Sequence, residues 1–264
     1  MEFVGYLASL FIGIALGLIG GGGSILTVPV LVYLFELPPV TATAYSLFIV
    51  GATSLVGAWP KYRRGLVDIK TATLFGIPSI AAVYATRKYL VPAIPDPLFM
   101  LGDFTFGKPM AVMLLFAVMM FAASISMIRK QPCKDCPEDA EIRYNYPMIF
   151  LEGMLVGTLT GLVGAGGGFL IIPALVLLSK LSMKKAVGTS LLIIAAKSLL
   201  GFMGDVANRP IEWGFLLLVT GLAILGFYLG NRISGRVSGH KLQKGFGWFV
   251  LLMSIYILIN ELFR

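Results

Sequence analysis

The sequence predicts an all-α polytopic membrane protein made of two inverted-topology repeats, each a glycine-broken helical hairpin followed by three transmembrane helices. Two observations lead to this prediction. The chain of 264 residues is 58% hydrophobic and only 13% charged, with a mean hydropathy of +0.89, whereas soluble domains are about 25% charged. In addition, the segment GLIGGGGSILTVP at residues 17–29 returns as GLVGAGGGFLIIP at residues 161–173.

Apolar stretches with few charges set the expected helices. Most have the length that helical chain needs to cross about 30 Å of hydrocarbon. Two of them, 24–35 and 168–179, are too short to span. No basic residues precede the first stretch and no small-residue cleavage site follows it, so we expect a retained helix and no signal peptide. The expected stretches are 3–19, 24–35, 41–59, 69–90, 109–128, 147–163, 168–179, 186–203, 212–232 and 243–262.

An internal duplication relates the two halves. With an offset of 144 residues and no gap, 19 of the 42 positions from Gly17 to Ala58 are identical. Apolar composition raises the number of chance matches, but it does not bring glycines, a proline and serines into register. We therefore predict a first transmembrane repeat at 1–128, a cytoplasmic linker loop at 129–146 and a second transmembrane repeat at 147–264.

Loop charges predict opposite orientations for the two repeats. Connector 61–65 holds three basic residues and its counterpart 204–211 holds one, while connector 36–40 holds one acidic residue and its counterpart 180–185 holds three lysines. Basic loops favour the cytoplasm. Equivalent loops are thus expected on opposite sides, with both termini outside and with connectors 61–65, 129–146, 180–185 and 233–242 in the cytoplasm. The net charge of +8 is attributed to these loops, and no nucleic acid is expected as a partner.

The glycine runs predict a ligand site at the membrane midplane. A glycine inside a helix costs about 1 kcal/mol relative to alanine, and backbone groups that a break frees cannot turn to water inside a bilayer. Transporters with inverted repeats place substrates where such discontinuous helices meet. Helix N-termini present free amides and a partial positive charge, so two short helices beginning after Gly23 and Gly167 would favour an anion.

Polar residues on the following helices extend this expected site. Ser46 and Thr53 are seven residues apart and share a helix face, and their counterparts are Ser190 and Lys197. A lysine far from either end of a membrane helix is by default a functional-site hypothesis. Helix packing by the glycines and serines, and snorkelling of Lys197, are the structural alternatives. The predicted substrate-binding residues are Gly20, Gly21, Gly22, Gly23, Ser24, Ser46, Thr53, Gly164, Gly166, Gly167, Gly168, Ser190, Lys197 and Ser198.

Cys133 and Cys136 form a CxxC pair in the expected linker. Such a pair can be redox-active or can supply half of a zinc site. The chain holds no second CxxC, and its single histidine, His240, lies in another loop. We interpret the pair as a tolerated, reduced loop feature, with regulation, metal capture and sulfur-linked chemistry left open. No metal, cofactor or catalytic residue is expected.

The duplicated pattern GLxGxGGGxLxxP, followed by AVGTSL at 186–191, resembles the TauE/SafE family of sulfite and organosulfonate exporters. The resemblance extends over essentially the whole chain. The first copy departs from the pattern with Ser24 at the fourth motif glycine and with ATAYSL at 42–47. The resemblance implies transport of sulfite, an organosulfonate or a related small sulfur-containing anion across a prokaryotic plasma membrane.

The expected function is that of a secondary transporter, with an exporter as the favoured direction and alternating access around a central anion site. No ATP-binding motif is present, so an ion gradient or the substrate's own gradient would drive transport. The expected partners are the anion and the lipid bilayer, and the oligomeric state is left open between a monomer and assemblies such as a homodimer. The alternatives are an anion channel-like pore and a sulfur-relay membrane protein that uses Cys133 and Cys136.

Overall fold

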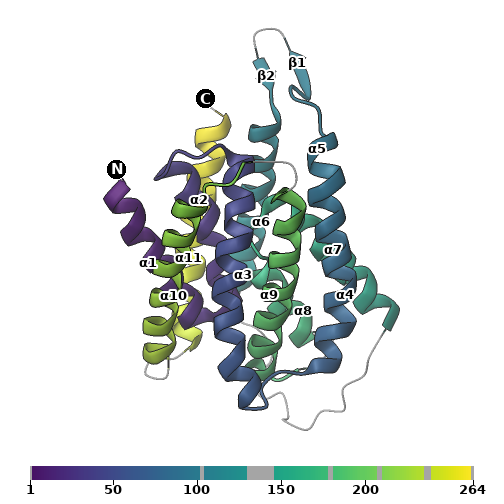
Figure 1. Ribbon diagram of the computed structural model, residues 1–264, viewed down its shortest axis with the longest axis vertical. Helices are drawn as coiled ribbons and strands as arrows, with labels where there is room; N and C mark the ends of the chain where they lie inside the picture. The colour runs from purple at the N-terminus through teal and green to yellow at the C-terminus, as the bar shows by residue number, and fades with distance from the viewer. Residues whose placement is uncertain are drawn as a thin grey trace.

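The computed structural model describes residues 2–101, 104–129, 146–177, 181–206, 210–234 and 239–262. These residues form a bundle of helices along one long axis (Figure 1). In the described part of the chain, six helical stretches are long and apolar enough to cross a membrane, so the protein is a multi-pass membrane protein. The first half contains α1 (Glu2–Ile19), the 3₁₀ helix η1 (Gly20–Leu26), α2 (Thr27–Tyr33), α3 (Pro39–Arg63), α4 (Ile69–Ala85), the π-helix η2 (Thr86–Leu90), α5 (Val91–Ala93) and α6 (Lys108–Ile128).

The second half contains α7 (Tyr146–Val163), α8 (Gly168–Leu177), α9 (Met183–Val206), α10 (Trp213–Ser234) and α11 (Gly239–Leu262). The expected apolar stretches therefore lie on helices in both halves. The connector between the expected stretches 69–90 and 109–128 contains a short antiparallel hairpin of β1 (Phe99–Leu101) and β2 (Phe104–Phe106), with Phe99 opposite Phe106. Three-residue strands on one hairpin do not change the helical class of the molecule.

The first glycine run reverses the chain, as predicted, but the returning helix begins earlier than expected. Gly20 has a φ of +75°, the left-handed region that a glycine enters without strain and that often ends a helix. The chain then runs back along α1, so that the rings of Tyr6 and Phe35 lie 5.4 Å apart. The prediction that a helix begins after Gly23 is wrong. The 3₁₀ helix η1 begins at Gly20, so Ser24 lies inside it and not at its N-terminus.

The second glycine run gives the predicted break. Helix α7 ends at Val163 and α8 begins at Gly168. Between them, Gly164, Gly166 and Gly167 have φ values of +74°, +65° and +70°, which side chains of L-residues rarely adopt. The segment Gly164–Gly167 is called the second break below.

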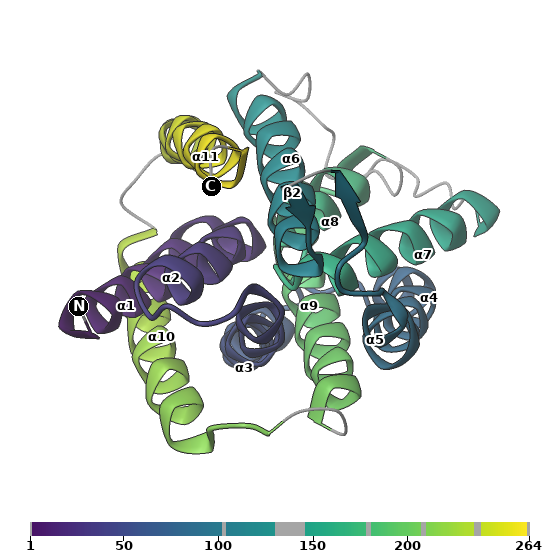
Figure 2. The ribbon, with the colours of Figure 1, turned by 90° about the horizontal axis from the view of Figure 1, so that it is seen from above.

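Helix contacts in one half have counterparts in the other half. Helix α1 packs on α10, and its equivalent α7 packs on α4. Helix α3 packs on its own equivalent α9, and α6 packs on its own equivalent α11 (Figure 2). Hydrogen bonds repeat in the same way: Asp68 N donates to Thr189 Oγ1 at 2.9 Å, and Glu212 N donates to Tyr45 OH at 2.8 Å. Since 68 pairs with 212 and 45 with 189 at the offset of 144, the two bonds are equivalent.

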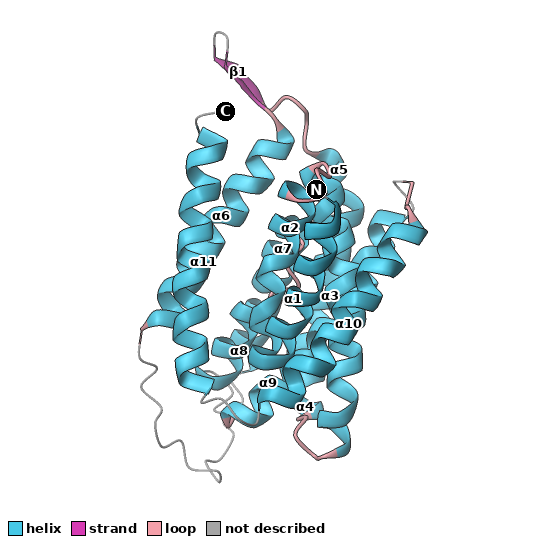
Figure 3. Ribbon diagram, turned by 90° about the vertical axis from the view of Figure 1, so that its left-hand side faces the viewer, coloured by secondary structure: helices cyan, strands magenta, loops and turns pink. Residues whose placement is uncertain are grey.

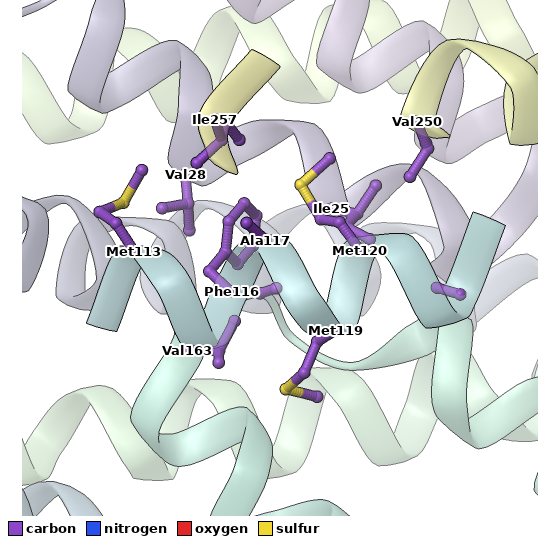
Figure 4. Close-up of a cluster of buried hydrophobic side chains, with 12 residues drawn as sticks. Ile25, Val28, Met113, Phe116, Ala117, Met119, Met120, Val163, Val250 and Ile257 are labelled. Atoms are coloured by element: carbon purple, nitrogen blue, oxygen red, sulfur yellow. The ribbon is translucent and has the colours of Figure 1, made fainter. Parts of the chain in front are cut away.

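A buried apolar cluster connects both glycine runs to the α6–α11 pair (Figure 4). Ile25 and Val28 enter it from the first hairpin, and Val163 and Ala165 enter it from the second. Helix α6 contributes Phe116 among other side chains, and α11 contributes residues such as Val250. The two breaks are therefore held inside the bundle and not at its surface.

The ends of α1 and α11 that carry the chain termini lie toward the same end of the bundle (Figures 1 and 3). An even number of crossings, as the sequence predicts, gives this arrangement. The structure contains no membrane, so which compartment faces this end stays a prediction.

Candidate functional site

The two glycine runs meet in the middle of the bundle. An ideal Cβ on Gly168 would lie 2.2 Å from Gly21 O, and one on Gly21 would lie 2.8 Å from the Cα of Gly168. Contacts this short leave no space for a side chain, so both positions need glycine. The sequence prediction that the breaks come together is borne out for this pair of residues.

Two further glycines make equivalent contacts with the long central helices. An ideal Cβ on Gly164 would lie 2.5 Å from Thr43 Cβ, and one on Gly20 would lie 2.8 Å from Val187 Cγ1. The pairs Gly20/Gly164 and Thr43/Val187 are both 144 residues apart. Each glycine run therefore packs against the first turns of the central helix from the other half. Gly20 contacts α9, and Gly164 contacts α3.

Lys197 lies against the second break. Its side chain is fully buried, and its Nζ donates a hydrogen bond to Thr160 Oγ1 at 2.9 Å. An ideal Cβ on Gly167 would lie 2.8 Å from the same Nζ. Among the residues that the structure describes, no carboxylate forms an ion pair with Lys197. A buried cation without a countercharge is costly, and an anion bound at the second break would supply that countercharge.

The predicted hydroxyl donors divide into two groups. Ser46 Oγ and Ser198 Oγ are buried and have no hydrogen-bond partner among the described residues. Ser24, Thr53 and Ser190 instead donate to backbone carbonyls one turn before them, at 2.7–2.9 Å. Among the predicted donors, Ser46 and Ser198 are thus the serines whose hydroxyls have no partner in the described residues.

Ser54 belongs with this first group, although the sequence analysis did not select it. Its Oγ is also buried without a partner among the described residues. It is the counterpart of Ser198 at the offset of 144. That register is the signal from which Ser54 could have been selected as a further candidate donor.

Several predicted glycine contacts do not reach the second break. Gly22 faces Ile19 and Met127, and Gly23 faces Ala15 and Leu16 of its own hairpin. At the second break itself, Gly164 N donates to Thr160 O at 2.8 Å and Gly167 N to Ala165 O at 2.7 Å. Leu170 N and Ile171 N also donate to Gly167 O, each at 3.0 Å. These four amides are occupied by the protein, which leaves the remaining amides at the start of α8 as those that could face an anion.

Comparison with known proteins settles the family. A model of the family described as "Sulfite exporter TauE/SafE" matches residues 6–257. The chain belongs to the TauE/SafE family. A "Probable membrane transporter protein" of Xylella fastidiosa (strain 9a5c) is 28% identical over 251 residues, which cover 94% of this chain and 91% of that protein.

Two relatives from Bacillus subtilis (strain 168) extend the comparison. The "Probable membrane transporter protein YdhB" is 26% identical over 86% of this chain and 88% of its own length. The "Probable membrane transporter protein YunE" is 28% identical over 83% and 84% of the two chains. No solved structure matches the chain significantly. The family and these relatives establish a membrane transporter at the level of class.

The sequence analysis missed a buried ion pair in this TauE/SafE protein. Arg87 in η2 and Asp205 near the end of α9 are 0% and 2% exposed, and Arg87 Nη1 lies 3.4 Å from Asp205 Oδ2. The same Nη1 donates to Thr43 Oγ1 at 3.1 Å. Arg87 lies beside Lys88 near the end of the expected stretch 69–90, where basic side chains usually extend toward the membrane surface, so its burial could not be read from hydropathy.

The cysteine pair contributes nothing to the described site. Cys133 and Cys136 lie outside the described residues. Within the described ranges, no group of three or more histidine, cysteine, aspartate and glutamate side chains is placed to hold a metal ion. The role of the pair in this TauE/SafE protein stays a prediction.

Proposed function

We propose that this TauE/SafE protein is a secondary transporter of a small sulfur oxyanion such as sulfite or an organosulfonate, with an anion site at the second break. The observation that carries the proposal is the burial of Lys197 against Gly167, with a neutral threonine as its hydrogen-bond partner. A charged residue inside a membrane protein needs a countercharge, and a substrate anion is the natural one.

Three kinds of donor are candidates for binding the anion. Lys197 supplies the positive charge, the first turn of α8 supplies backbone amides and the positive end of a helix dipole, and Ser46 and Ser198 supply unpartnered hydroxyls. An oxyanion has several oxygens that each accept hydrogen bonds, so it can use all three. A halide would use fewer of them, which favours an oxyanion as the substrate class.

Alternating access is the proposed mechanism, and the repeat geometry supports it. In Figure 1 the hairpin of α1 and α2 enters from the upper end of the bundle, and the hairpin of α7 and α8 enters from the lower end. The paired contacts α1–α10 and α7–α4 fit this opposite orientation. Two inverted repeats can exchange their conformations around one central site and thereby open it to either side in turn.

Export is the proposed direction, because the membrane potential favours it. An interior that is negative by 100 mV provides about 2.3 kcal/mol for each negative charge expelled. An anion can therefore leave the cell without a coupling ion. This argument needs no ATP-binding motif, and none is present in the sequence.

The purified protein tests the proposal in two steps. Thermal-shift titrations with sulfite, sulfoacetate, taurine, thiosulfate, sulfate and chloride report binding, because a ligand that binds the folded state raises the unfolding midpoint. Proteoliposomes then report transport. We expect sulfur oxyanions to raise the midpoint most, and labelled substrate to enter faster against unlabelled internal substrate. Flux that is linear in concentration without counterflow would instead identify a channel-like pore.

A further inference from the structure

Arg87 is a second fully buried cation in the membrane-embedded bundle. It lies in η2, a π-helical segment that interrupts the otherwise continuous helix from α4 to α5. Single turns of π-helix are frequent at functional sites. The neighbouring Thr86 also lies against Gly161 of α7, where an ideal Cβ would come within 2.9 Å of Thr86 Cβ. The segment with Arg87 therefore packs directly on the helix that leads into the second break.

One intervening side chain, that of Thr43, connects Arg87 to the second break. Its Nη1 donates to Thr43 Oγ1 at 3.1 Å, and Thr43 is the residue on which Gly164 rests. At the other end of the break, Gly167 lies against Lys197. One buried cation thus belongs to each end of the segment Gly164–Gly167. Arg87 is linked to Gly164 through Thr43, and Lys197 lies against Gly167.

Asp205 forms an ion pair with Arg87 in this structure. The distance from Nη1 to Oδ2 is 3.4 Å, whereas a close charge-assisted hydrogen bond measures about 2.7–2.9 Å. The Asp205 carboxylate is itself a small oxyanion group. It has the chemistry that a substrate anion would bring to the same guanidinium.

The first glycine run has no equivalent of this arrangement. At the offset of 144 residues, Arg87 corresponds to Asn231, Asp205 to Lys61 and Lys197 to Thr53. Both buried cations therefore belong to the second break alone. A pair that served only to hold the bundle together would not need to differ between the two repeats in this way.

We infer that Arg87 is a second anion-coordinating residue and that Asp205 is its internal competitor. In the substrate-free protein the Asp205 carboxylate holds Arg87. An oxyanion that moves along the second break displaces that carboxylate and binds Arg87. This inference rests on the proposed function, since it assigns a further contact to the same substrate anion.

The competition predicts opposite effects for the two partners. The apparent affinity for a ligand falls by the fraction of protein in which its site is available. Asp205→Asn removes the competing carboxylate from Arg87 and should tighten sulfite binding, by about threefold or more. The double variant Arg87→Gln/Asp205→Asn removes both charges together and should bind sulfite about tenfold more weakly than the wild type, because one charge-assisted contact is lost.

Sulfite titrations of the purified full-length chain, with Lys197 intact, measure these affinities. The matched control is Glu261→Gln, because Glu261 is another buried carboxylate, which accepts a hydrogen bond from Tyr33 OH at 3.3 Å outside the second break. This variant should bind sulfite with unchanged affinity. If Asp205→Asn does not fold, the double variant still decides, since it removes both charges together.

Two outcomes would overturn the inference while the proposed function stands. One is wild-type sulfite affinity in the double variant, which would make the ion pair purely structural. The other is unchanged or weaker binding by a folded Asp205→Asn protein. If the wild type binds neither sulfite nor any other sulfur oxyanion, the proposed function fails first and the inference fails with it.

Discussion

The backbones of Gly21 and Gly168 are in direct contact where the two hairpins meet, so closely that a Cβ on Gly168 would lie 2.2 Å from Gly21 O. The two residues lie 147 positions apart in the sequence, in different repeats. This contact fixes the position of the α8 N-terminus relative to the first hairpin. It is therefore the point at which the fold determines the geometry of the proposed anion site.

Gly168→Ala should disrupt this contact and lower both thermal stability and anion affinity. The atom that a Cβ would strike belongs to the backbone, so the two hairpins must move apart. Overpacking of this kind costs about 1–3 kcal/mol. Gly221→Ala on α10 is the control, because a Cβ there meets nothing within 4 Å, and alanine is the better helix former. Equal unfolding midpoints for the two variants would contradict the contact.

The helices were predictable from the sequence because membrane helices are long apolar stretches, and α9 and α11 follow this rule closely. The meeting of the two breaks was predictable from the repeat. The earlier start of the first returning helix was not, because a 3₁₀ helix over Gly20–Leu26 depends on packing against α1. Arg87 was not predictable as a buried residue either, because its burial depends on Asp205 and Thr43, which are distant in sequence.

Ser198→Ala should separate binding from stability. The Ser198 hydroxyl is buried without a partner among the described residues, so its removal should leave stability unchanged or raise it. Loss of a hydrogen bond from this hydroxyl to the charged anion should weaken binding by about tenfold or more. Ser9→Ala is the matched control: Ser9 is buried on α1 and donates to Gly5 O at 2.8 Å. Anion affinities that fall equally in both variants would count against a direct role for Ser198.

The predicted orientation can be tested with single cysteines in a background that lacks Cys133 and Cys136. Glu36 and Lys61 flank the two ends of α3, so cysteines at these positions should label from opposite sides of the membrane. The loop charges place position 61 in the cytoplasm and position 36 outside. Labelling of both positions by a membrane-impermeant reagent from the same side, or in the reversed order, would refute the assignment.

The Cys133→Ser/Cys136→Ser variant should transport at close to the wild-type rate. The proposed site lies at the second break and uses no thiol. Flux into inverted vesicles, normalised to the amount of protein in the membrane, provides the measurement. A loss of more than about tenfold, equivalent to about 1.4 kcal/mol, would favour the sulfur-relay alternative over the anion site.

Sulfite affinity of Lys197→Met tests the central claim most directly. The account predicts a folded protein, because removal of a buried charge without a carboxylate partner does not leave a new charge unpaired. It also predicts binding weakened by about 10- to 150-fold, which corresponds to 1.5–3 kcal/mol for a lost charge-assisted interaction. Lys197→Arg should restore only part of the affinity, since the guanidinium is larger and forked.

Lys185→Met, at an exposed position in the first turn of α9, removes the same charge away from the break and should bind as the wild type does. The measurement is a sulfite titration of the four purified proteins at one ionic strength. A dissociation constant for Lys197→Met that lies at least tenfold above those of the wild type and Lys185→Met is the result that the account predicts. Equal dissociation constants for the wild type and Lys197→Met would contradict it.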